Sequence, residues 1–185
     1  MTRWIALLRG VNVGGRRRVP MAELREVIAG LGCTGAATLL QSGNAVFSRR
    51  SGPSGPGGEQ ELRAELEAAL AERFGFAVDT VLRDADELRA VVRANPLPVG
   101  DPSRFLVLFL REESDAAALA RLDTAAFAPE AMAVGAREVY FDLPDGLGRA
   151  KLPDAAARAL GGPVATGRNW RTVLSLLKLA EKGEE

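Results

Sequence analysis

Short apolar runs alternate along the chain with longer segments in which apolar residues recur at helical spacing. A short apolar run that ends in glycine or charge is typical of a buried strand, whereas the helical period is typical of an amphipathic helix. In the first half this pattern predicts strands over residues 3–8, 37–40, 45–48 and 77–82 and helices over 20–31 and 59–74. The resulting order, β-α-β-β-α-β, is that of a ferredoxin-like sheet.

The same order recurs in the second half of the chain. Strands are predicted over residues 105–110, 131–134, 138–143 and 164–166, and helices over 114–122, 151–160 and, at the C-terminus, 169–182. A helix over 84–94 and a proline-bearing connector precede them, and a loop rich in glycine, proline and serine is expected over 51–58. We therefore predict an α+β fold of two ferredoxin-like (βαββαβ) halves with an extra C-terminal helix, divided as 1–83, 84–103 and 104–185.

The loop that leaves the first strand combines backbone freedom with positive charge. It contains Gly14 and Gly15, the basic triplet Arg16 to Arg18, and Pro20, which suits the first turn of a helix. Its glycine spacing matches neither the dinucleotide-binding fingerprint nor a P-loop. The loop is therefore interpreted either as backbone amides that receive a phosphate or carboxylate at a helix N-terminus, or as a turn that needs positive φ. The basic triplet has two interpretations as well: its arginines clamp an anion, or they form a solvated part of the loop.

Topology predicts which other segment lies beside this loop. In the split βαβ sheet the third strand lies antiparallel between the first two, so the end of strand one and the turn between strands two and three share one sheet edge. That turn is tight, because Gly43 and Asn44 both suit positive φ. The predicted ligand-binding cluster is Arg9, Asn12, Gly14, Gly15, Gln41, Ser42 and Asn44.

The second half holds further candidates. Asn169 is expected to cap the last helix and Trp170 to pack into the core, which leaves Arg168 as an exposed cation beside a helix N-terminus. Lys151 is interpreted either as a ligand contact or as an ordinary surface residue. The segment around Arg168 and Asn169 is expected at the opposite edge of its own sheet. It is a separate candidate site, which joins the first only if the two halves pack with that edge inward.

Composition narrows the chemistry. Histidine is absent, which removes the commonest general base and metal ligand, and the single cysteine, Cys33, rules out an internal disulfide or thiolate cluster. No metal and no cofactor are predicted. The 24 basic and 24 acidic residues cancel, which disfavours nucleic acid as a partner. No apolar run approaches membrane-spanning length, so no membrane association and a cytoplasmic location are expected.

The sequence also resembles a bacterial family catalogued as domain of unknown function 1697. The segments that carry the resemblance are 8–15, 19–21, 41–44 and 168–170. The resemblance implies a two-part, ferredoxin-like α+β fold and no established activity. Family members often have Ser-Lys where this chain has Ala150-Lys151, and Asn where it has Arg171, so the resemblance supports no catalytic hydroxyl at position 150.

These features suggest three alternative hypotheses for the function. The first is binding of a small anionic metabolite or nucleotide at the glycine loop, because the cluster offers many donors and no strong base. The alternative is an enzyme that acts on a phosphorylated or acyl substrate by charge stabilisation, with Glu23 as the nearest carboxylate base. The third is a nucleic-acid-binding module, disfavoured by a pI of about 6.4 and few exposed strand aromatics.

Overall fold

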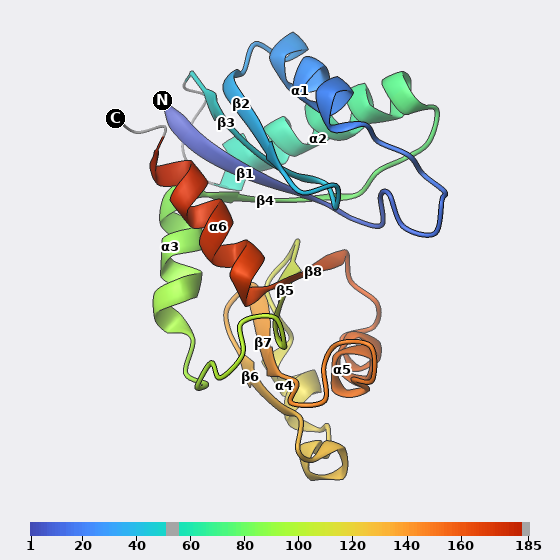
Figure 1. Cartoon of the computed structure of the whole chain (residues 1–185), viewed down its shortest axis with the longest axis vertical. Coiled ribbons are helices and arrows are strands. Elements are labelled where there is room, and N and C mark those ends of the chain that lie inside the picture. Colours follow the sequence, from blue (N-terminus) through green and yellow to red (C-terminus); the bar gives the residue numbers. More distant parts are fainter. Residues whose placement is uncertain (51–55, 183–185) are drawn as a thin grey trace. The chain divides into compact units, whose positions relative to one another are not determined.

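The computed structural model describes residues 1–50 and 56–182, so most of the predicted loop at 51–58 lies outside the described residues. The chain forms two compact units, Met1–Leu88 with Leu176–Glu185 and Arg89–Ser175. Each unit holds one four-stranded antiparallel sheet with helices on it (Figure 1). The predicted α+β fold of two ferredoxin-like halves and a C-terminal helix is confirmed. The division at residues 84 and 103 stays a prediction.

The first unit contains β1 (Thr2–Leu8), α1 (Met21–Gly30), β2 (Thr34–Leu39), β3 (Asn44–Arg49), α2 (Pro56–Phe74) and β4 (Thr80–Asp84). Its strand order is β2-β3-β1-β4, with β3 antiparallel to both β1 and β2. The register pairs Leu7 with Asn44, so the end of β1 lies opposite the start of β3. This is the arrangement on which the predicted meeting of the two loops depends.

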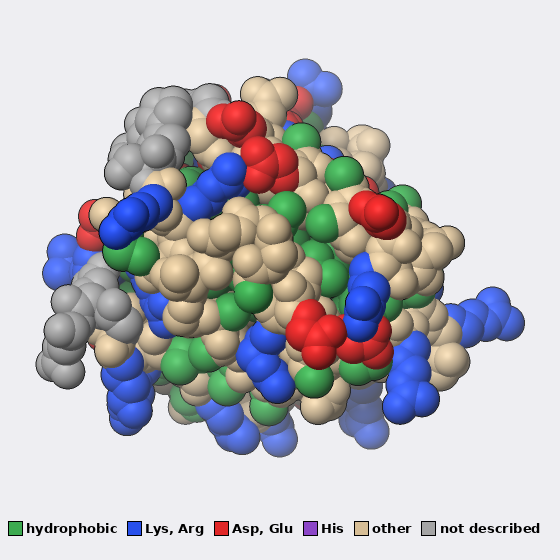
Figure 2. Space-filling model, turned by 90° about the horizontal axis from the view of Figure 1, so that it is seen from above, with side chains coloured by type: hydrophobic (Ala, Val, Ile, Leu, Met, Phe, Trp, Pro, Cys, Tyr) green, Lys and Arg blue, Asp and Glu red, His purple; other side chains and the backbone are tan. Residues whose placement is uncertain are grey.

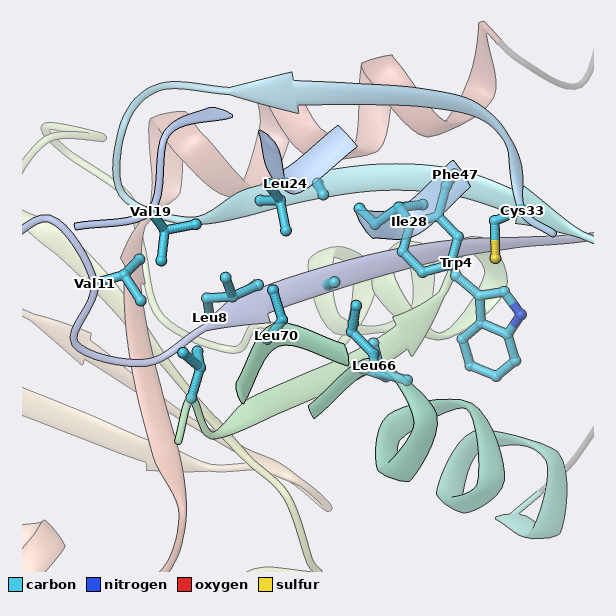
Figure 3. Packing of buried hydrophobic residues seen from close by; sticks show 14 of the residues in the cluster. Trp4, Leu8, Val11, Val19, Leu24, Ile28, Cys33, Phe47, Leu66 and Leu70 are labelled. Atoms are coloured by element: carbon cyan, nitrogen blue, oxygen red, sulfur yellow. The ribbon is translucent and has the colours of Figure 1, made fainter. Parts of the chain in front are cut away.

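The core of the first unit lies between the sheet and helices α1 and α2. Leu24 and Ile28 of α1 and Leu66 and Leu70 of α2 point into it beside Leu8 of β1 (Figure 3). Val11 and Val19, which flank the glycine loop, are also buried there, at 2% and 0% exposure. Burial of such side chains contributes about 1.5–3 kcal/mol each, which fixes both ends of the loop although its middle is exposed.

The second unit repeats this topology with a different set of elements. They are β5 (Phe105–Leu110), α4 (Ala116–Ala120), η1 (Thr124–Phe127), β6 (Ala131–Val134), β7 (Glu138–Asp142), α5 (Leu152–Ala159) and β8 (Ala165–Asn169), in the sheet order β6-β7-β5-β8. Helices α3 (Ala85–Ala94) and α6 (Trp170–Glu181) are each divided between the two units. Within the described residues, no helix is long and apolar enough to cross a membrane.

Two boundaries differ from the sequence prediction. The helix predicted over 114–122 is shorter, because Asp115 is its cap residue and accepts a hydrogen bond from the Ala118 N–H, so that α4 begins at Ala116. The last strand is longer than predicted and includes Gly167, Arg168 and Asn169, since these residues continue its pairing with β5 as far as Leu106. Segment 167–169 is therefore part of a sheet and not a loop.

Tyr140, the single tyrosine of the chain, provides a test of packing in the second unit. Its hydroxyl donates to the Val91 carbonyl at 2.7 Å, and burial, followed by the nearby Glu138 carboxylate, raises its pKa. A pKa that is raised in the folded state stabilises the fold fully below the unfolded value, about 10, and this contribution is lost as pH rises above it. We expect phenolate absorbance to appear only together with loss of native circular dichroism, whereas ionisation near pH 10 in the native protein would contradict this packing. The variant Tyr140→Phe is expected to lose about 1 kcal/mol of stability.

Candidate functional site

The glycine loop and the β2–β3 turn lie against one another, as predicted. The Leu8 N–H donates to the Gly43 carbonyl at 2.8 Å, and the Asn12 side-chain amide donates to the Gln41 carbonyl at 2.6 Å. A Cβ added at Gly43 would lie 2.6 Å from Val11 Cγ2 and 2.7 Å from Leu8 Cβ, so the turn packs closely against both residues. The predicted neighbourhood of these two segments is confirmed by direct contacts.

Asn12 ties the loop to both of its neighbours. Besides the Gln41 carbonyl, its Nδ2 donates to the Val19 carbonyl at 2.8 Å, and its Oδ1 accepts from the Val19 N–H at 2.8 Å. The backbone of Asn12 has φ 57°, a left-handed conformation that asparagine tolerates better than most residues. The side chain predicted to orient a ligand therefore uses both of its polar atoms to hold the chain.

Gly14 and Gly15 form the tip of a small hairpin. Val13 and Arg16 are bridged across it, and the two glycines have φ of 63° and 73°. Positive φ at both central residues defines a type I′ turn, which is why glycine suits both positions. The turn interpretation accounts for both glycines, and an anion bound to their amides stays a prediction.

Two arginines attach this loop to the segment that precedes β4. Arg17 donates to the Ala77 carbonyl, and its guanidinium lies 5.4 Å from the centre of the Phe76 ring. Arg9 forms an ion pair with Asp79 at 3.4 Å, and about half of each side chain is exposed. Arg9 therefore has a carboxylate partner already, and an exposed pair of this kind contributes little stability.

The β2–β3 turn reaches positive φ in a way that differs from the prediction. The two left-handed residues are Leu40, at 59°, and Gly43, at 78°. Asn44 instead begins β3 and is fully buried, and its Nδ2 donates to the Leu39 carbonyl and Ser42 Oγ, each at 2.9 Å. Asn44 thus closes the turn from inside, where a ligand at the surface does not reach it.

A groove of about 510 Å³ opens beside these two segments, at the N-terminal end of α1. Two exposed cations, Arg18 and Arg25, line it, and Arg25 Nη1 donates to Thr38 Oγ1 at 2.7 Å. The remaining residues of the lining come from the glycine loop, the first turn of α1 and the β2–β3 turn: Asn12, Val19, Pro20, Met21, Ala22, Leu40 and Gln41. The groove therefore presents positive charge and contains no carboxylate among its described lining residues.

The predicted cluster is only partly brought to this groove. Asn12 and Gln41 line it, whereas Arg9, Gly14, Gly15, Ser42 and Asn44 are not among its lining residues. Arg25 and Thr38 were missed by the sequence analysis. The signal was available for Arg25, because it follows Met21 by one helical turn and so shares its face of the helix.

Helix α1 also lacks a capping side chain at its N-terminus, where Pro20 is the cap residue. In the part of the chain that the structure describes, α3, α4, α5 and α6 each have a capping oxygen. Asp84, Asp115 and Asn169 accept first-turn N–H bonds in α3, α4 and α6, and the Glu130 carboxylate accepts from Lys151 and Leu152 at the start of α5. The first turn of α1 therefore borders the groove without a capping side chain, and Glu23, the acidic residue of that turn, is paired with Arg73 and does not line the groove.

The candidates of the second unit have structural roles in it. Arg168 is 8% exposed, so the predicted exposed cation is wrong; it lies in β8 and donates to Thr166 Oγ1 at 2.7 Å and to the Gly167 carbonyl. Burial lowers its pKa to about 10. Asn169 caps α6 as predicted, and Trp170 packs edge-on against Phe105 at 5.3 Å. Lys151 remains exposed, with its backbone N–H bound by Glu130.

Groups suited to metal binding or nucleophilic chemistry are not gathered anywhere in the described part of the chain. No three His, Cys, Asp or Glu side chains lie close enough to share a metal ion there. Cys33 is buried, and burial raises its pKa, which lowers its thiolate fraction. Glu23, the base considered for the enzyme hypothesis, pairs with Arg73 of α2 at 2.9 Å and does not line the groove.

The surface also bears on the nucleic-acid hypothesis. Figure 2 shows acidic side chains lying among basic ones on the face it presents, without one continuous basic area. The strand aromatics Trp4, Phe47, Phe105, Phe109, Tyr140 and Phe141 are all buried, so these described positions offer no stacking platform for bases. The expectation that nucleic acid is an unlikely partner stays a prediction.

Fold and site together define an α+β protein of two ferredoxin-like units, the first of which carries an arginine-flanked groove. The chain belongs to the family described as protein of unknown function (DUF1697), whose model matches residues 1–140. The resemblance noted in the sequence is thereby confirmed. Three of the four segments that carried it, 8–15, 19–21 and 41–44, meet at or beside the groove.

A solved structure shares the fold over almost the whole chain. It is described as the conserved bacterial protein SP0830 from Streptococcus pneumoniae and has a TM-score of 0.75 with 23% sequence identity, covering 97% of this chain and 98% of that one. At this level of identity the likeness shows the shared fold. The chain matches no curated protein.

Proposed function

We propose that the protein binds a small anionic metabolite or nucleotide in the groove at the start of α1. One observation carries the proposal: Arg18 and Arg25 flank a groove of about 510 Å³ that has no carboxylate among its described lining residues. Guanidinium groups bind phosphate and carboxylate in paired, directional hydrogen bonds. The first turn of α1 has no capping side chain, so its backbone N–H groups add further hydrogen-bond donors for an anion.

The arrangement favours binding over catalysis. The described lining of the groove contains no Asp, Glu, Cys or His, and Glu23 is engaged by Arg73. General base catalysis needs an acceptor within hydrogen-bond reach of the proton that moves. The enzyme hypothesis, transfer or hydrolysis of a phosphoryl or acyl group, therefore ranks second and would require the substrate or a metal to supply the base.

We expect inorganic phosphate and nucleoside monophosphates to stabilise the protein in a thermal-shift titration, because a ligand that binds only the folded state raises its stability. Replacing either Arg18 or Arg25 by alanine should weaken binding about tenfold. A tenfold loss corresponds to about 1.4 kcal/mol, which is what a hydrogen bond to a charged group contributes. The fold should survive both changes, since both side chains are exposed.

The matched control is Arg16→Ala. Arg16 is an exposed arginine of the same triplet and does not line the groove, so its loss removes the same charge from the loop without removing a groove donor. Binding that falls equally in Arg16→Ala and Arg18→Ala would indicate general attraction by the basic loop and would overturn the site. Retained binding in the Arg18→Ala, Arg25→Ala double variant would overturn it as well.

A further inference from the structure

Leu40 is an unusual residue for its position. It occupies the left-handed region at φ 59°, which a branched apolar side chain rarely adopts, and it is 60% exposed. Its side chain therefore gains little from burial while its backbone has an unfavourable conformation. Glycine or asparagine would serve a tight turn better, so turn formation alone does not account for leucine here.

The position of Leu40 in the groove gives this residue a use. It lines the same cavity as Arg18 and Arg25, together with the apolar residues Pro20 and Met21. An inorganic anion would contact the arginines and leave Leu40 in water. A ligand with a carbon body attached to its anionic group would cover Leu40 and bury apolar surface at the same time.

We infer that the groove selects an organic phosphate or carboxylate with an apolar body, whose anionic group is held by Arg18 and Arg25 and whose carbon atoms pack against Leu40. This inference rests on the proposed function and narrows its ligand class. The groove should bind anions with an apolar body more tightly than inorganic phosphate and more tightly than polar sugar or glycerol phosphates. Leu40 is then the specificity-determining residue and the arginines supply the common affinity.

The experiment uses three probes of similar charge, namely phenyl phosphate, glycerol phosphate and inorganic phosphate, titrated by calorimetry. The unchanged protein should bind phenyl phosphate about tenfold more tightly than the other two, since covering a leucine-sized apolar contact is worth about 1.4 kcal/mol. The variant Leu40→Gly should lower phenyl phosphate affinity to that of inorganic phosphate and leave the other two affinities unchanged.

Leu40→Gly is well suited to this test because glycine adopts φ near 59° without steric cost, so the turn should keep its conformation. A second variant, Leu40→Asn, also tolerates this φ and keeps a side chain of similar size without the apolar contact, and it should behave like Leu40→Gly. Binding of all three probes with equal affinity, unaffected by Leu40→Gly, would overturn the inference and leave the anion site standing. Failure of every probe to bind would overturn the proposed function itself.

Discussion

Replacing Gly43 by alanine is expected to destabilise the protein by about 3 kcal/mol. Two costs combine at this position. The backbone has φ 78°, where an L side chain costs about 1–2 kcal/mol, and the new Cβ would lie 2.6 Å from Val11 Cγ2 and 2.7 Å from Leu8 Cβ. Overpacking against buried neighbours typically costs about 1–3 kcal/mol more. Urea unfolding measures the sum, which is a large share of the stability of an ordinary domain.

Two glycine controls separate the costs. Gly14 has φ 63° but nothing within 4 Å of an added Cβ, so Gly14→Ala should show only the conformational cost. Gly100 has neither a positive φ nor a close neighbour, so Gly100→Ala should leave stability nearly unchanged. If Gly43→Ala proves no more harmful than Gly14→Ala, the close approach of the turn to Leu8 and Val11 is wrong.

The neighbourhood of the glycine loop and the β2–β3 turn was predictable from the sequence. The apolar run that became β1 and the helical spacing of Leu24 and Ile28 are set by burial, and burial leaves a pattern in the sequence. Once the strand order followed from the element order, the loop after β1 and the turn before β3 had to share an edge. Topology therefore brought Asn12 and Gln41 together without any local signal between them.

The roles of individual side chains were less accessible. An asparagine that binds its own chain and one that binds a ligand look identical in a sequence, because the difference lies in where the amide points. Asn12 and Asn44 both turn inward here. Arg168 was misplaced for a related reason: glycine and asparagine around it are typical of a loop, and only pairing with β5, a long-range contact, makes this segment a strand.

Loss of the Asn12 amide donors is expected to be the second most damaging change, at about 2 kcal/mol of stability. The side chain donates to the Val19 and Gln41 carbonyls and accepts from the Val19 N–H, and each such bond is worth about 1 kcal/mol. Asn12→Asp tolerates the same positive φ and keeps the acceptor, but it removes both donors and places a negative charge beside two carbonyl oxygens. Chemical unfolding should therefore show a lower free energy of unfolding for Asn12→Asp, and backbone strain does not explain this loss.

Asn12→Gly and Gln41→Ala complete this test. Glycine suits φ 57° and removes all three bonds, so Asn12→Gly should lose at least as much stability as Asn12→Asp. Gln41→Ala keeps the backbone carbonyl that Asn12 binds, and its exposed side chain should cost less than about 0.5 kcal/mol. An Asn12→Asp protein as stable as Gln41→Ala would mean that the Asn12 amide does not hold the glycine loop to the turn. The groove would then have to be shaped by the burial of Val11 and Val19 alone.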